Sequence, residues 1–326
     1  MKQRIDYLDI AKGIGILLMV SAHIYDNDPY QIAVYSFHMP LFILISGFLL
    51  GKSKNADKPF GAFFASKFKG LMVPYIITEI CVLPLFYFKQ GCQPADLKWI
   101  ITDSLFLYYT RGSATWFLLS LFLSEVIFWL LRKCFQDMKL LAAICILLYI
   151  LSACGYSGNH IATIVLRSLH GIFFLFVGYS VAHMGKERKL STAQLGLLTI
   201  IYCFATLFNG KVAMVNSNYG NLALYTYTSL VGSYLVLLIS KWLANHSALS
   251  KINGFIKYWG RNSLHVVCAH LILLRYGIDW YFGTGPHYPF FTGSLIFGFV
   301  LLCEFLLIEA AGWFKPLLGQ RCANRK

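Results

Sequence analysis

The sequence predicts an all-α, polytopic membrane protein. Hydrophobic residues make up 58% of its 326 positions, charged residues make up only 13%, and the mean hydropathy is +0.62. This balance lies outside the range of ordinary soluble domains. Two further observations favour a membrane protein: long apolar windows recur along the whole chain, and basic residues gather in alternate segments between them.

The apolar windows define the predicted elements. A helix needs about 20 residues to cross a hydrocarbon layer of ~30 Å. Segment 97–109 is a candidate for an interfacial helix rather than a membrane span. The sequence contains no Pro/Ser-rich linker and no evident internal repeat. We therefore expect one membrane domain over residues 1–326, ending in a basic cytoplasmic tail of about twelve residues. The ten predicted spans are 8–24, 34–50, 70–88, 115–131, 139–155, 160–183, 193–209, 222–243, 261–275 and 289–311.

The basic residues test this topology independently. If the amino end is inside, 21 of the 28 Lys and Arg residues fall in inner segments, as short cytoplasmic loops require. The pattern predicts a multi-pass protein of the cytoplasmic (inner) membrane with both termini cytoplasmic. It also accounts for the net charge of +14, so no nucleic-acid partner is implied. The nine cysteines form no CxxC pair and predict neither a disulfide framework nor a metal site.

The first span carries ionisable residues that a lipid-facing helix would exclude. Such a group costs roughly 2.5 to 3.5 kcal/mol on insertion scales, so it is kept mainly where it faces protein or a wet cavity. Lys12 and His23 are eleven residues apart, which is about 1100° of helical rotation and ~16 Å of rise. They therefore share one face at two depths. The plain structural alternative is that Lys12 pairs with Asp9, one turn away.

Several more cations and imidazoles are predicted in the outer half of the membrane. A single histidine in an apolar helix is more often a packing residue than a catalyst. Several in one layer, however, indicate a polar reaction chamber. Besides His23, this layer contains His38, Arg111, Trp116, Arg167, His170, His270 and Arg275.

Five segments follow one another along nearly the whole chain: RIDYLDIAKGIGILLMVSAHI, FHMPLFILISGFLL, WFLLSLFL, HGIFFLFVGYSVAH and YWGRNSLHVVCAHLILL. Taken together and in this order, they resemble the acyltransferase-3 family of integral membrane acyltransferases, and in particular its fucose 4-O-acetylase group. The most specific element of the resemblance is a basic residue and a histidine separated by ten residues, here Lys12 and His23. Many members have Arg at the first position, and Lys lacks the bidentate fork of Arg.

The resemblance implies an O-acetyltransferase. Members move an acyl group, usually acetyl from cytoplasmic acetyl-CoA, to a hydroxyl of a cell-envelope polysaccharide or lipid-linked sugar. The expected partners are therefore the lipid bilayer, acyl-CoA and a glycan acceptor, with acetyl-CoA as co-substrate and no metal. A homo-oligomer is left open.

Acyl transfer needs a group that removes the hydroxyl proton and groups that hold the donor and acceptor. We assign His23 as the base, with a transient acyl-histidine as an open alternative. His38 is expected to orient His23 or the oxyanion. Lys12, with Asp9 beside it, is expected to contact CoA. The predicted acceptor-binding residues are Trp116, Arg167, His170, His270 and Arg275.

Other classes fit less well. No GxSxG elbow supports a Ser/His/Asp hydrolase, and no HExxH or Cys/His spacing supports zinc. A transporter or flippase of a small solute or lipid-linked sugar would also explain intramembrane cations, but matching halves with interrupted helices are not visible. A purely structural membrane subunit would leave the histidines unexplained. The acceptor sugar, the acylated hydroxyl and the identity of the acyl group stay open.

Overall fold

The computed structural model describes residues 5–53, 57–90, 114–154, 160–184, 190–283 and 287–314, and these are largely helical. Within these ranges extended chain occurs only as two isolated bridges, Tyr25 with Tyr288 and Ala213 with Asn218. The predicted all-α class is therefore confirmed. Segment 97–109, the candidate for an interfacial helix, and the predicted basic tail lie outside the described residues.

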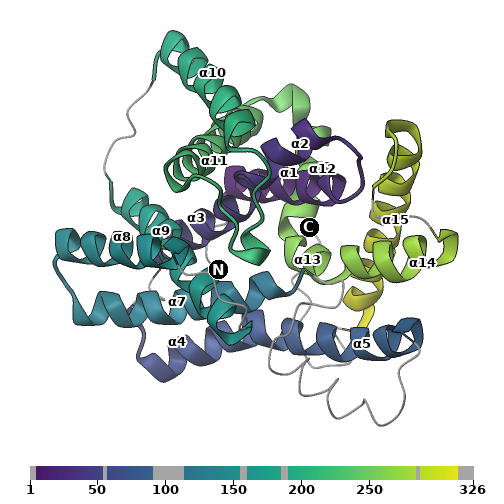
Figure 1. The fold of residues 1–326 in the computed structure, drawn as a ribbon, viewed down its shortest axis with the longest axis horizontal. Coiled ribbons are helices and arrows are strands. Elements are labelled where there is room, and N and C mark those ends of the chain that lie inside the picture. Colours follow the sequence, from purple (N-terminus) through teal and green to yellow (C-terminus); the bar gives the residue numbers. More distant parts are fainter. Residues whose placement is uncertain are drawn as a thin grey trace.

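The helices gather around the amino-terminal segment. Figure 1 shows α4 and α5 along the lower edge of the molecule and α10 at the upper edge, with α1, α3, α11 and α12 between them. The helices of the first half are α1 (Asp6–Ala22), α2 (Asp28–Tyr35), α3 (His38–Gly51), α4 (Phe60–Lys67), α5 (Val73–Gln90), α7 (Trp116–Cys134) and α8 (Met138–Cys154). Those of the second half are α9 (His160–His183), α10 (Thr192–Asn209), α11 (Leu222–Asn245), α12 (Ser250–Arg261), α13 (Ser263–Ile272), α14 (Asp279–Phe282) and α15 (Phe290–Phe314).

Each of the ten predicted spans overlaps a helix. By length and apolar composition, six helical segments of the described chain can cross a membrane, whereas α1 has 17 residues and falls short of that length. The membrane character is thus supported, while the number ten and the sidedness of the termini stay predictions. The six segments are Asp28–Gly51, Phe60–Phe86, Ile161–His183, Thr192–Asn209, Leu222–Asn245 and Phe290–Gly312.

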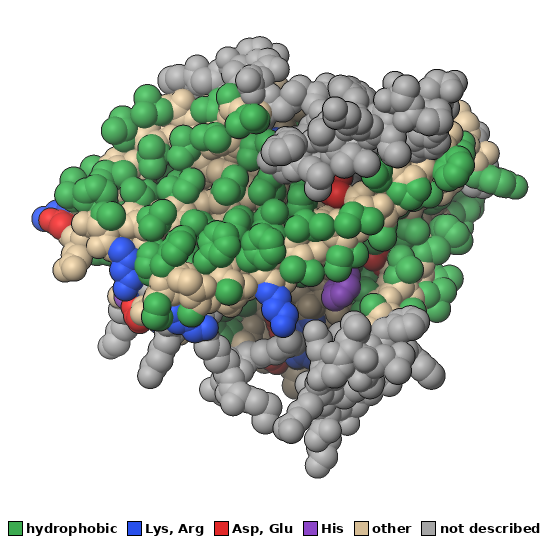
Figure 2. All heavy atoms as spheres, turned by 90° about the horizontal axis from the view of Figure 1, so that it is seen from below, with side chains coloured by type: hydrophobic (Ala, Val, Ile, Leu, Met, Phe, Trp, Pro, Cys, Tyr) green, Lys and Arg blue, Asp and Glu red, His purple; other side chains and the backbone are tan. Residues whose placement is uncertain are grey.

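The exterior is apolar over broad areas. Figure 2 shows a band of hydrophobic side chains across one face, with Lys and Arg side chains near its lower rim. On α15 the exposed side chains include Phe290, Phe291 and Leu295. A contiguous apolar surface of this kind is unfavourable in water and suits contact with lipid.

Helix α1 is held at the centre by close contact with α12. Gly13 lies against the backbone carbonyl of Ile256, and Gly260 lies against that of Asp9, so a Cβ atom at either glycine would overlap the facing carbonyl. Small residues at such crossings allow two backbones to approach closely. Helix α12 is amphipathic and precedes α13; it was not expected as a separate element, because the sequence reading began the ninth span at residue 261.

The chain after α1 is tied to the chain before α15. The N–H of Tyr288 donates to the carbonyl of Ile24 at 2.8 Å, and the N–H of Asp26 donates to the carbonyl of Tyr288 at 2.9 Å. These bonds join segments more than 260 residues apart in the sequence. They place the loop before α15 next to His23, at the end of α1.

Candidate active site

Two adjoining cavities meet at His23. The first, called the chamber below, has a cavity volume of about 160 Å³ and is lined by His23, Tyr35, His38, Trp116 and Arg275 among apolar side chains. The second, called the charged mouth, is lined by His23, Tyr35, Lys211, Arg275, Asp279 and His287, together with two leucines. Because His23, Tyr35 and Arg275 line both, the two cavities share one wall.

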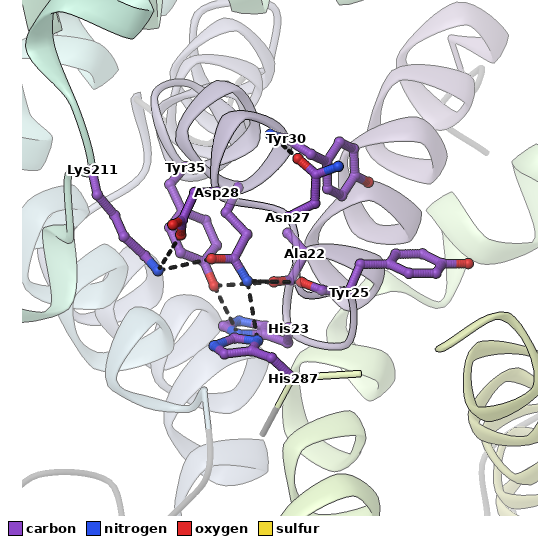
Figure 3. A network of polar contacts seen from close by, with 10 residues as sticks. Ala22, His23, Tyr25, Asn27, Asp28, Tyr30, Tyr35, Lys211 and His287 are labelled. Atoms are coloured by element: carbon purple, nitrogen blue, oxygen red, sulfur yellow. Dashed lines mark hydrogen bonds and ion pairs between the residues drawn. The ribbon is translucent and has the colours of Figure 1, made fainter. Parts of the chain in front are cut away.

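His23 ends α1 and contacts two other titratable rings. Its Nδ1 is hydrogen-bonded to the Tyr35 hydroxyl at 3.2 Å. That hydroxyl also lies 3.4 Å from the carbonyl of Ala22. If the hydroxyl donates to this carbonyl, its oxygen accepts from His23 Nδ1–H, and Nε2 of His23 is left free to take a proton. Figure 3 shows Tyr35 reaching His23 from α2.

His38 begins α3 and has a defined tautomer. Its Nδ1 lies 2.8 Å from the carbonyl oxygen of Val34, and since a carbonyl only accepts, Nδ1 carries the hydrogen. Nε2 of the neutral ring is then an acceptor. Its ring centroid is 5.5 Å from that of Tyr35, whose ring also contacts His23. His38 therefore suits taking a proton better than donating to an oxyanion.

His270 approaches His23 from α13. The two ring centroids are 5.6 Å apart. Nδ1 of His270 donates to the carbonyl of Val266, which leaves Nε2 as an acceptor. This Nε2 is buried and has no hydrogen-bond partner among the described residues. The ring thus presents an unused acceptor beside His23.

Arg275 and Trp116 complete the wall of the chamber. Arg275 belongs to a π-helical turn, Leu273–Ile278, that follows α13. Trp116 is the first residue of α7. The guanidinium of Arg167 lies 5.2 Å from the Trp116 ring centroid, a cation–π contact, and Arg167 Nε donates to the carbonyl of Thr163. Trp116 therefore faces the chamber, while Arg167 supports its ring.

A polar network closes the charged mouth. The side-chain amide of Gln31 donates to the carbonyls of Ala22 and Tyr25 and contacts Nδ1 of His287 at 3.1 Å. Its carbonyl oxygen accepts from Lys211 Nζ at 2.8 Å. Figure 3 shows that these groups come from three separate parts of the chain. Gln31 thus contacts both the loop that carries Lys211 and the loop that carries His287, next to His23.

The comparison with protein families decides the class. The family model described as an acyltransferase domain, Acyl_transf_3, matches residues 5–308. The chain belongs to the acyltransferase-3 family. Neither the curated proteins nor the solved structures contain a match. Membership makes the protein a membrane acyltransferase, and the narrower likeness to fucose 4-O-acetylases stays a prediction.

In this acyltransferase the residues predicted to bind CoA lie away from the chamber. Lys12 Nζ is 2.8 Å from Asp9, and Arg261 approaches the same carboxylate at 3.2 Å. Asp9 is buried, whereas Lys12 keeps 23% of its side-chain surface exposed. The ion pair considered as the plain alternative is therefore present. The CoA role of both residues stays a prediction.

The predicted acceptor-binding residues divide into two groups. Trp116 and Arg275 line the chamber, and His270 stands next to it. His170 is fully buried in an aromatic cluster, stacked on Tyr219 at 3.7 Å and bonded through Nδ1 to Ser152. These contacts suit a packing role for His170. Arg111 lies outside the described residues.

Four lining residues were not singled out from the sequence. Tyr35 and Asp279 carried no special signal, because aromatic and acidic residues near helix ends are common. Lys211 was noticed only as a loop charge, and His287 lies in a loop whose position depends on the pairing with Ile24. Within the described ranges, no group of three or more His, Cys, Asp or Glu side chains is placed to hold a metal ion.

Proposed function

We propose that this acyltransferase moves an acyl group, acetyl in the first instance, from acyl-CoA to a hydroxyl of an envelope polysaccharide or a lipid-linked sugar. The observation that carries the proposal is the position of His23 on the wall shared by two cavities, within a chain of this family. One cavity can hold the thioester while the other holds the alcohol. A base between them would touch both reactants.

His23 is the proposed general base. The acceptor O–H gives its proton to Nε2 as the oxygen attacks the thioester carbonyl, and the imidazolium then returns the proton to the departing thiolate. A C–O bond forms, the C–S bond breaks, and no net proton is released. Tyr35 holds the other ring nitrogen, as the orienting partner of a catalytic histidine does. An acyl-histidine intermediate uses the same position.

His38 is the second candidate for proton transfer. Its Nε2 is the acceptor nitrogen and its ring lines the chamber. Of these two histidines, His23 lines both cavities and His38 lines the chamber alone, which favours His23 as the group that meets the alcohol. His38 would then relay or balance charge within the chamber. The two roles separate by substitution, since loss of the base removes nearly all turnover.

Thiol release from acyl-CoA tests the activity. Full-length protein in detergent is supplied with acetyl-CoA, succinyl-CoA or a longer acyl-CoA and an extract of envelope glycans as acceptor. Acyl transfer predicts acceptor-dependent release of CoA without a sealed membrane, and labelled acyl groups recovered on the glycan. A protein that releases no thiol from any donor, yet moves a sugar into sealed vesicles, would contradict the proposal and support transport.

A further inference from the structure

The charged mouth contains the guanidinium of Arg275, which is not paired directly with the one carboxylate of the lining. Arg275 is partly buried and lines both cavities, yet its guanidinium makes no hydrogen bond or ion pair within the described part of the chain. Asp279, the carboxylate of the same mouth, instead accepts a hydrogen bond from the Tyr288 hydroxyl at 2.6 Å. A partly desolvated cation without a partner is unfavourable unless a ligand supplies the negative charge.

A second cation approaches the same mouth. Lys211 Nζ is held by the Gln31 carbonyl oxygen at 2.8 Å, and its nearest carboxylate, Asp28, is 3.7 Å away. Asp28 is 78% exposed in its side chain, so water screens this pair. Figure 3 shows the Lys211 side chain extended toward Asp28 and Tyr35. Lys211 is therefore fixed in position and only weakly neutralised.

The chemistry of these groups specifies a ligand. Arg presents a planar fork that binds carboxylate or phosphate oxygens in pairs, and Lys adds a point charge. Arg275 and Lys211 bring two positive charges to the lining against the single negative charge of Asp279, so the mouth as a whole favours an anion. The same mouth includes His23, so an anion bound at Arg275 brings a neighbouring hydroxyl to the proposed base.

We infer that the acceptor is an acidic sugar: the hydroxyl that receives the acyl group belongs to a unit bearing a carboxylate or phosphate, which Arg275 and Lys211 bind in the charged mouth. The inference rests on the proposed function and adds the class of acceptor. The transfer itself is unchanged, because the anionic group takes no part in bond formation. Two other sources of an anion at Arg275 are the phosphates of CoA and the oxyanion of the reacting thioester, and the test separates them.

Matched acceptors provide the first arm of the test. The full-length protein in detergent is assayed for thiol release from acetyl-CoA with methyl α-glucuronide, glucose 1-phosphate and neutral methyl α-glucoside. We expect kcat/KM to be at least about tenfold higher for one of the anionic acceptors, the size of one charge-assisted pair. Which of the two is preferred distinguishes a carboxylate from a phosphate. Equal use of all three would overturn the inference while leaving acyl transfer intact.

Variants of the two cations provide the second arm. Arg275→Gln is expected to raise the KM of the anionic acceptor and abolish the preference over the neutral one, Arg275→Lys to keep part of it, and Lys211→Gln to weaken it. Lys251→Gln, on an exposed residue of α12, is the matched control. An increase confined to the KM of acetyl-CoA would assign Arg275 to CoA. An equal loss of kcat for all acceptors would assign it to the oxyanion. Either result overturns the inference.

A binding measurement keeps the inference testable if transfer fails altogether. Equilibrium dialysis of labelled glucose 1-phosphate and methyl α-glucuronide against the wild-type protein needs no acyl donor. Saturable binding of either probe, at least about tenfold weaker in Arg275→Gln and unaffected in Lys251→Gln, supports the anion site. Binding that Arg275→Gln leaves unchanged, or no binding of either probe, contradicts it. Loss of thiol release with every acceptor would count against the proposed function alone.

Discussion

The imidazole rings of His23 and His270 lie 5.6 Å apart, although the two residues are separated by almost 250 positions in the sequence. His270 donates from Nδ1 to the Val266 carbonyl, so its buried Nε2 faces its surroundings as an acceptor. A protonated His23 formed during the reaction would find in that nitrogen a group able to stabilise its charge.

Replacement of His270 is therefore expected to slow the chemical step. We expect His270→Ala to lower kcat by about 10- to 100-fold with little change in either KM, since the ring supports His23 and contacts no substrate in this account. The measurement is steady-state thiol release from pH 5.5 to 8.5. His270→Gln, which keeps an acceptor, should recover part of the rate and shift the acidic limb of the profile. A rise in KM at constant kcat would instead show that His270 binds the acceptor.

Replacement of Lys12 tests whether the basic residue of the first helix binds the acyl donor, acetyl-CoA. Lys12→Gln is expected to raise the KM of acetyl-CoA with kcat nearly unchanged, because it removes the cation that is expected to contact CoA. If Lys12 only balances Asp9, then Lys12→Gln leaves a buried carboxylate undercompensated and lowers thermal stability instead. The double variant Asp9→Asn/Lys12→Gln separates the two. It restores stability in the second case and leaves the KM high in the first.

The crossing of α1 and α12 is expected to tolerate no side chain larger than hydrogen at its two contact glycines, Gly13 and Gly260. Gly260→Ala places a Cβ against the carbonyl of Asp9 and should lower stability by about 1–3 kcal/mol, the usual cost of overpacking. Gly254→Ala, on the same helix, meets open space and is the control. Thermal unfolding in detergent gives the comparison. Equal melting temperatures for the two variants would show that the helices do not cross this closely.

His287 is expected to make the closure of the charged mouth sensitive to pH. Partial burial, and then the nearby Lys211, lowers the pKa of His287 below its ordinary value near 6.5, although Asp26, Asp28 and Asp279 oppose this. A ring with an unprotonated Nδ1 can face the Gln31 amide nitrogen at 3.1 Å, whereas the protonated ring would set two hydrogen-bond donors against each other. The folded state thus binds the proton less readily than the unfolded state, so this stability is present above about pH 6.5 and is lost as the pH falls. Melting temperatures between pH 7.5 and 5 should decline less in His287→Asn than in wild type, and parallel declines would refute the assignment.

Much of the helical architecture could be predicted because the bilayer imposes a length and a composition on each element. The common depth of His23, His38, Trp116 and Arg275 could also be predicted, since residue spacing along the helices and loop charges place all four in one layer of the membrane. Which side chains contact each other within that layer could not be predicted. Arg167 and His170 share a helical face, yet one contacts Trp116 and the other packs on Tyr219, because the neighbouring helices differ along that face.

The positions of the loop residues in the site could not be predicted from the sequence. Lys211 and His287 reach the site only because Gln31 holds one and the pairing of Tyr288 with Ile24 holds the other. Contacts of this kind depend on tertiary geometry, for which hydropathy and spacing carry no signal. Helix α12 escaped notice for a related reason: its amphipathic pattern continues directly into the apolar residues of α13.

The rate of a single turnover by His23→Gln tests the central claim most directly. Labelled acetyl-CoA is mixed with excess protein and acceptor, and product is followed for wild type, His23→Gln, His38→Gln and the control His246→Gln, an exposed histidine remote from the chamber. We predict that His23→Gln slows acyl transfer by at least about 100-fold, more than His38→Gln, with unchanged binding of acetyl-CoA. A rate for His23→Gln equal to that of His246→Gln would contradict the assignment of His23 as the base.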